Sequence, residues 1–187
     1  MIKFETQRLI VRDYTGSDLD GLHRLMSDKE NMYYLDDIAT DTLAQSKGRL
    51  DYAAANADGH YFCICEKDTG DFVGSVGYTY TAHTPIGKIG HMGYFILPAF
   101  QRRGYTPEAA ACALRFAFEK DGCIRITIAH YKDNIPSGKV IVRLGFRKEA
   151  EQIKAQYHDG VMKDRVEYAI NKDEWPAIEH SLTEGNL

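Results

Sequence analysis

Residues 100–110 read Phe-Gln-Arg-Arg-Gly-Tyr-Thr-Pro-Glu-Ala-Ala, a basic turn centred on Gly104 that leads into an alanine-rich segment. We expect a strand to end near Leu97 before this turn and a helix to run from about residue 107 to residue 120 after it. The first turn of a helix has backbone N–H groups without intrahelical partners and carries the positive end of the helix dipole. The turn is therefore a candidate anion site, to which Arg102 and Arg103 add charge.

The composition of the chain is that of an ordinary globular protein. Of 187 residues, 44% are hydrophobic and 27% are charged, and the formal net charge is -4. We expect residues 1–187 to form a single domain without a nucleic-acid partner. We see no signal peptide or membrane-spanning apolar run, so we expect a cytoplasmic protein with no membrane partner. The four cysteines form no C-x-x-C pair and are expected to be reduced and without metal, and three of them lie in apolar runs that predict burial.

Hydrophobic periodicity predicts a mixed order of strands and helices. Ser17 is the expected N-cap of the first helix, with Asp20 at its third position. Strands are expected over residues 2–13, 61–65, 72–81, 88–97, 124–131, 146–155 and 161–170, and helices up to residue 26 and over residues 41–57, 107–120 and 134–144. This order predicts an α+β fold with a twisted, mostly antiparallel central sheet of about seven strands and helices on both faces.

The hexapeptide Gln101-Arg102-Arg103-Gly104-Tyr105-Thr106 resembles the (Gln/Arg)-x-x-Gly-x-(Gly/Ala) signature of the GCN5-related N-acetyltransferase (GNAT) superfamily. Three further segments are similar to its ribosomal-protein N-acetyltransferase-like (RimJ/RimL-type) branch. They are Thr6-Gln7-Arg8-Leu9-Ile10-Val11-Arg12, Gly93-Tyr94, and Asn134-x-x-Ser137 leading to Leu144-Gly145-Phe146. The resemblance covers nearly the whole chain and implies a GNAT fold, in which acetyl-CoA lies where two parallel strands, here residues 88–97 and 124–131, splay apart.

The resemblance also implies which residues bind the cofactor. Gln101, Arg102, Arg103, Gly104, Tyr105 and Thr106 would hold the pyrophosphate of acetyl-CoA. Backbone N–H groups near Phe95, Ile96 and Leu97, beside a β-bulge, would receive the pantetheine and the thioester oxygen. The chain departs from the family in having Thr106 in place of glycine or alanine. Pro107 also removes one N–H group, so the site would depend more on arginine charge.

Two polar residues on the helix at 134–144 are candidates for the chemistry of the leaving thiol. Asn134 and Ser137 are one helical turn apart and face roughly the same way. By resemblance, Ser137 would act as general acid to the departing sulfur, and Asn134 would bind the pantetheine amide or an ordered water. The alternative is that Asn134 is only an N-cap, with Ser137 at the third helical position.

His91 is the candidate general base. It lies two residues before Gly93-Tyr94, where members of the family that the chain resembles commonly carry a glutamate. A neutral imidazole can accept a proton from the substrate ammonium group directly or through water. The alternative is a partly buried histidine that only bonds its neighbours.

Tyr33, Tyr34 and Asp36, between the first two helices, and Tyr94 are candidates for binding the acceptor amine. The predicted function is direct transfer of acetyl from acetyl-CoA to a primary amine, a protein N-terminus or a small molecule, through a ternary complex. We expect a monomer or a homodimer. The alternative is an acyl-CoA-binding or regulatory module that has lost turnover. The chain lacks the motifs of P-loop kinases, zinc proteases and serine hydrolases.

Overall fold

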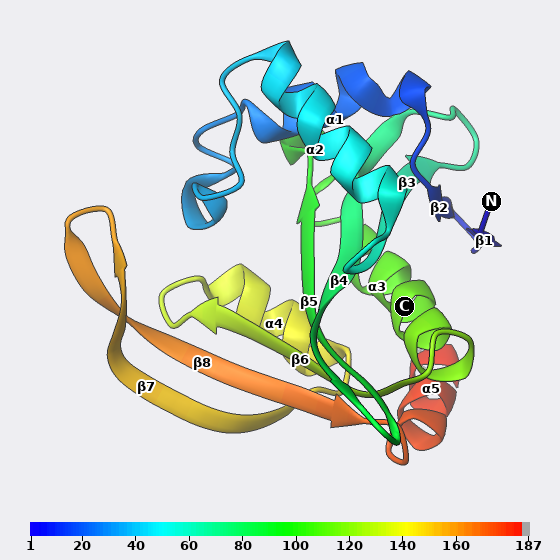
Figure 1. Ribbon diagram of the computed structural model, residues 1–187, viewed down its shortest axis with the longest axis vertical. Coiled ribbons are helices and arrows are strands. Elements are labelled where there is room, and N and C mark those ends of the chain that lie inside the picture. The colour runs from blue at the N-terminus through cyan, green and yellow to red at the C-terminus, as the bar shows by residue number, and fades with distance from the viewer. Residues whose placement is uncertain (185–187) are drawn as a thin grey trace. The chain divides into compact units, whose positions relative to one another are not determined.

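The computed structural model describes residues 1–184 (Figure 1). Its strands are β1 (Lys3–Glu5), β2 (Leu9–Asp13), β3 (Gly59–Glu66), β4 (Phe72–Thr84), β5 (Gly87–Ile96), β6 (Cys123–Tyr131), β7 (Arg147–His158) and β8 (Val161–Asn171). Its helices are α1 (Leu19–Met26), α2 (Leu43–Ala55), α3 (Tyr105–Glu119), α4 (Ile135–Arg143) and α5 (Trp175–Glu184), with short 3₁₀ turns η1 (Gly16–Asp18), η2 (Tyr33–Leu35) and η3 (Pro98–Phe100).

The strands form one eight-stranded sheet in the order β1-β2-β3-β4-β5-β6-β8-β7. β5 and β6 pair in parallel, whereas the pairs β1–β2, β2–β3, β3–β4, β6–β8 and β7–β8 are antiparallel. The predicted mixed fold with a mostly antiparallel sheet is therefore confirmed.

The sheet has eight strands rather than about seven because the segment predicted as one strand over residues 2–13 is a hairpin. The Thr6 N–H donates to the Leu9 carbonyl at 3.0 Å, and the Leu9 N–H donates to Thr6 Oγ1 at 2.8 Å. These two bonds reverse the chain between β1 and β2.

Two helix starts also differ from the prediction. Ser17 does not cap α1, because it lies inside η1 and Asp18 occupies the N-cap position of α1. Helix α3 begins at Tyr105, two residues earlier than expected. Pro107 is thus its third residue, where a missing N–H breaks no intrahelical bond.

The chain divides into two compact units. Unit 1 comprises residues 1–79 and 93–113, and unit 2 comprises residues 80–92 and the chain from residue 114 onward. Strands β4 and β5 and helix α3 contribute residues to both units. The expectation of a single domain remains a prediction.

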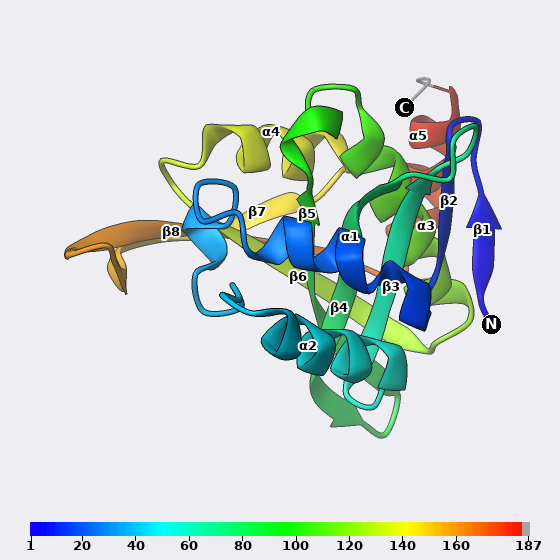
Figure 2. The ribbon, with the colours of Figure 1, turned by 90° about the horizontal axis from the view of Figure 1, so that it is seen from above.

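In unit 1, α1 and α2 lie side by side (Figure 2). A core cluster joins them to β3 and to the start of β4. Its members are Tyr14, Leu22, Leu25, Met26, Leu50, Cys63, Cys65 and Phe72. The opposite side of β3 is covered as well, because Phe62 and Ile64, which alternate with the cysteines, are fully buried.

In unit 2, apolar side chains of β6 and β8 are buried, and α5 packs against the end of α3. The ring of Trp175 packs 5.7 Å from that of Phe118. Val166, Tyr168 and Ile170, which alternate along β8 and so share one face of this strand, are all buried. All four cysteines are free and buried, whereas the sequence predicted burial for three of them. Within residues 1–184, no helix is both long enough and apolar enough to cross a membrane.

Candidate active site

The basic turn predicted to bind an anion lies in unit 1, directly before the fifteen-residue helix α3. Within residues 1–184, the backbone N–H groups of Arg103, Gly104, Tyr105 and Thr106 have no hydrogen-bond acceptor. Buried or half-buried N–H groups normally find a partner, and a helix dipole favours negative charge at this end. Four consecutive unpaired donors are therefore ready to receive an anion.

The conformation of this turn explains its glycine. Arg102 and Gly104 both have left-handed backbone, with φ of 62° and 79°. Turns with left-handed residues typically direct successive N–H groups to one concave side. A Cβ at Gly104 would make only an ordinary contact with Arg8 Nη2, at 3.4 Å, so the left-handed backbone, and not the available space, accounts for the glycine.

Arg8 and Glu108 hold the turn in place. Arg8 Nη1 donates to the Arg103 carbonyl at 2.8 Å, and its Nε donates to Glu108 Oε2 at 2.8 Å. Glu108 is only 6% exposed and lies in the first turn of α3. Because the guanidinium of Arg8 balances this carboxylate, Glu108 does not oppose an anion at the neighbouring N–H groups.

The side chains of Arg103 and Tyr105 both face Glu66. Arg103 Nη1 lies 3.7 Å from Glu66 Oε1, and its guanidinium lies 5.3 Å from the ring centre of Phe100. The Tyr105 hydroxyl donates to Glu66 Oε1 at 2.7 Å, which raises the pKa of this buried tyrosine. The side chain of Tyr105 is therefore buried and already bonded to Glu66. The group that Tyr105 contributes to the anion site is its backbone N–H.

At the end of β5, some predicted donors already have partners. The Leu97 N–H donates to the Val73 carbonyl at 2.9 Å. Gln101 Nε2 donates to Asn31 Oδ1 at 2.8 Å and to the Ile96 carbonyl at 3.3 Å. The side chain of Gln101 thus fixes the turn to the end of β5. The N–H groups of Phe95 and Ile96 remain the predicted donors to the cofactor.

The predicted acceptor-binding residues are also in unit 1. Tyr33 and Tyr34 lie in η2 with their rings edge to face, 4.9 Å apart, and Asp36 follows as the C-cap. Tyr94 lies on β5 and is half-buried. Their role in binding an amine remains a prediction.

His91 lies in unit 2, on the parallel ladder of β5 and β6, whose last pair is His91 with Thr127. The Thr127 hydroxyl donates to the Gly90 carbonyl at 3.1 Å, so it accepts from His91 Nδ1 at 2.9 Å. The imidazole proton is therefore on Nδ1, and Nε2 keeps its lone pair. Burial first, and then the charge of Arg165, lower the pKa of His91. The ring is thus a neutral potential proton acceptor at pH 7.

Asn134 and Ser137 lie at the N-terminus of α4, also in unit 2. Asn134 is the N-cap, and its Oδ1 accepts the Ser137 N–H at 3.3 Å. The predicted cap is confirmed, and Ser137 occupies the third helical position. Their predicted roles toward the cofactor remain predictions.

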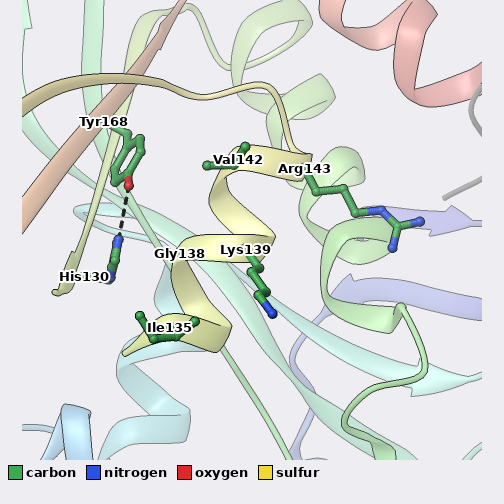
Figure 3. A pocket seen from close by; sticks show the side chains of 7 residues that line it. All are labelled: His130, Ile135, Gly138, Lys139, Val142, Arg143 and Tyr168. Atoms are coloured by element: carbon green, nitrogen blue, oxygen red, sulfur yellow. Dashed lines mark hydrogen bonds between the residues drawn. The ribbon is translucent and has the colours of Figure 1, made fainter. Parts of the chain in front are cut away.

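A groove of about 490 Å³ lies along α4 (Figure 3). Its lining residues are His130, Ile135, Gly138, Lys139, Val142, Arg143 and Tyr168. His130 Nδ1 donates to the Tyr131 carbonyl at 2.7 Å, so in a neutral ring Nε2 accepts from the Tyr168 hydroxyl at 3.3 Å. Neither Asn134 nor Ser137 lines this groove, and no motif in the sequence indicates it.

Comparison with known proteins agrees with this geometry. Residues 8–147 match the model of the family described as "Acetyltransferase (GNAT) domain". YoaA of Bacillus subtilis, an uncharacterised N-acetyltransferase, is 26% identical over 90% of this chain and 96% of its own length. The ribosomal protein uS5-alanine N-acetyltransferase of Escherichia coli is 26% identical over 62% of this chain and 59% of its own length.

Solved acetyltransferase structures share this fold. Spermidine N-acetyltransferase of Vibrio cholerae, solved with CoA and spermine, superposes with a TM-score of 0.80 at 16% identity, over 91% of this chain and 98% of that one. The family match covers most of the chain and includes β5, the basic turn and α4. The chain therefore belongs to the GNAT acetyltransferase family.

Proposed function

We propose that this protein transfers the acetyl group of acetyl-CoA directly to a primary amine through a ternary complex. The observation that carries the proposal is the run of four unpaired N–H groups, Arg103 to Thr106, at the start of α3 in a chain of the GNAT family. A pyrophosphate has the charge and the oxygen acceptors that such a run binds.

Each half of the cofactor has its own set of residues in this proposal. The N–H groups of residues 103–106 bind the pyrophosphate, and the guanidinium groups of Arg102 and Arg103 add charge. The N–H groups of Phe95 and Ile96 bind the pantetheine and the thioester oxygen. Asn134 binds the pantetheine amide while it caps α4. Binding by fixed backbone donors needs little reorganisation when negative charge develops on the thioester oxygen.

The chemical step moves protons as well as the acetyl group. The substrate ammonium loses a proton to His91 Nε2, directly or through water, and becomes a nucleophilic amine. The amine nitrogen attacks the carbonyl carbon, the N–C bond forms, the C–S bond breaks, and the nitrogen releases its second proton to solvent. The thiolate of CoA takes a proton from the Ser137 hydroxyl, which is restored from solvent. A thiol with a pKa of about 8.5 is a good enough leaving group that this acid gives modest assistance.

The acceptor class follows from groups that attract a cation. Tyr33, Tyr34, Asp36 and Tyr94 offer aromatic faces and one carboxylate, which suit an ammonium group. One relative is named as an N-acetyltransferase of an alanine of ribosomal protein uS5, and one structural neighbour as an N-acetyltransferase of spermidine, which is an amine. We propose a protein N-terminus or a small polyamine as the acceptor.

Initial rates of thiol release test this function. The purified chain is assayed with acetyl-CoA and a panel of N-terminal peptides and polyamines, with both substrates varied. Acetylation with intersecting double-reciprocal lines supports a ternary complex, whereas parallel lines indicate a covalent acetyl-enzyme. Tight acetyl-CoA binding without acetylation of any amine supports the alternative, a binding module that has lost turnover.

A further inference from the structure

Two cysteines of unit 1 face each other inside the core, and neither is among the residues proposed for acetyl transfer. Cys63 and Cys65 lie on the same side of β3, where strand residues two apart point the same way. Their sulfur atoms are 3.6 Å apart, and the residues are 0% and 5% exposed. No disulfide joins them.

A buried carboxylate completes a group of three possible metal ligands. Asp18, at the end of η1, is 6% exposed, and its ligand atom and the two sulfurs all lie within 4.8 Å of one another. Its Oδ1 accepts one hydrogen bond, from Arg12 Nη2 at 2.7 Å, so this oxygen keeps a further lone pair. Within residues 1–184, this is the one group of three histidine, cysteine or acidic side chains with such spacing.

We propose that Asp18, Cys63 and Cys65 bind one divalent thiophilic cation, with Zn²⁺ as the expected ion. Zn–S bonds of about 2.3 Å in a tetrahedral site place two sulfurs about 3.8 Å apart, close to the observed 3.6 Å. The three ligands leave a fourth position for water. Cysteine sulfur selects Zn²⁺ over Mg²⁺ or Ca²⁺, which prefer oxygen.

The charges of the cluster match a dication. Two thiolates and one carboxylate carry three negative charges, and the guanidinium of Arg12 carries one positive charge. Arg12 also donates to Asp18 Oδ2 at 2.8 Å and lies 3.5 Å from Cys65 Sγ. It therefore orients two of the ligands, as outer hydrogen-bond partners do in metal sites. Binding releases the two thiol protons and links η1 to β3 without any oxidation.

Metal content and cobalt spectroscopy on the full chain test the site. The protein purified with Zn²⁺ and then dialysed is expected to retain one zinc ion per chain. Replacement by Co²⁺ is expected to give a thiolate-to-cobalt charge-transfer band that Zn²⁺ abolishes. Absence of stoichiometric zinc and of the charge-transfer band overturns the proposal, as does a cysteine pair that only oxidises to a disulfide.

Matched serine variants identify the ligands. Cys65→Ser is expected to weaken Co²⁺ binding by more than about 100-fold, because loss of a mere outer partner already costs about 10–100-fold. Cys123→Ser removes a buried cysteine outside the cluster and is expected to keep the band. Equal loss in both variants contradicts the assignment. If Cys65→Ser does not fold, the melting temperature of the wild-type protein tests the site instead. The proposal requires that Zn²⁺ raises this temperature and that Mg²⁺ does not.

Discussion

His91 is the residue whose replacement tests the proposed chemistry most sharply. Burial and the charge of Arg165 lower its pKa below the ordinary value of about 6.5. At pH 7 more than about 75% of the rings are therefore neutral, with the lone pair on Nε2. A positioned general base contributes about 10²–10⁴-fold to rate. We expect His91→Ala to lower kcat at pH 7 by at least about 100-fold.

The pH dependence separates this role from a structural one. The wild-type advantage over His91→Ala is expected to shrink as the pH falls through the lowered pKa, because the imidazole becomes protonated. The wild-type advantage also shrinks as the pH approaches the pKa of the substrate amine, because more of the substrate is then already deprotonated and needs no general base. The assay is kcat/KM for thiol release across about pH 5 to 9 with one amine. Unchanged kcat and an unchanged pH profile in His91→Ala refute the base assignment.

Thr127 offers a matched test of how the imidazole is held. Its hydroxyl accepts the His91 Nδ1 proton, which leaves the lone pair on Nε2. Thr127→Val keeps the shape but removes the bond, and we expect a loss of about 1 kcal/mol, or about fivefold in kcat. Thr127→Ser keeps the hydroxyl and is expected to retain most of the activity. Equal kcat in the valine and serine variants contradicts this positioning role.

Four further outcomes are expected. Arg103→Ala raises the dissociation constant of acetyl-CoA about tenfold in low salt by calorimetry, whereas Arg24→Ala on α1 leaves it unchanged; an equal effect of both removes the anion assignment. Glu108→Gln lowers the free energy of unfolding in urea by about 2 kcal/mol, because it breaks the ion pair between the buried Glu108 and the partly exposed Arg8, and an unchanged midpoint contradicts this. Gly138→Ala lowers the melting temperature, since its Cβ would lie 2.9 Å from His130 Cε1; a rise shows that helix propensity outweighs the clash. Finally, the lowered pKa of His91 means that the unfolded chain binds more protons below about pH 6.5, so wild-type stability relative to His91→Ala falls as the pH drops through that range.

Elements with a clear hydrophobic period could be located from the sequence. The strand predicted over residues 124–131 is β6 (Cys123–Tyr131), and the helix predicted over residues 134–144 is α4 (Ile135–Arg143) with Asn134 as its cap. The hairpin between β1 and β2 was missed because its turn contains neither glycine nor proline. The turn is held by the Thr6 hydroxyl oxygen, which accepts the Leu9 N–H, and a single threonine is a weak turn signal.

The site was only partly predictable, for a different reason. The basic turn and its helix are local in sequence, so their chemistry follows from neighbouring residues. The bond from Arg8 to Glu108 joins residues 100 positions apart, and the bond from His91 to Thr127 depends on the register of β5 and β6. Neither contact can be inferred without the fold, although Arg8 lies in a segment that already resembled the family.

The central claim is that the chain acetylates amines with acetyl-CoA. The most direct measurement is mass spectrometry of the acceptor amine alongside titration of free CoA thiol, in one reaction with a peptide N-terminus or a polyamine. We predict acetylated amine and free thiol in equal amounts, both absent without protein and strongly reduced in His91→Ala. Thiol release without acetylated amine, or saturable acetyl-CoA binding with no product from any amine, would contradict the account.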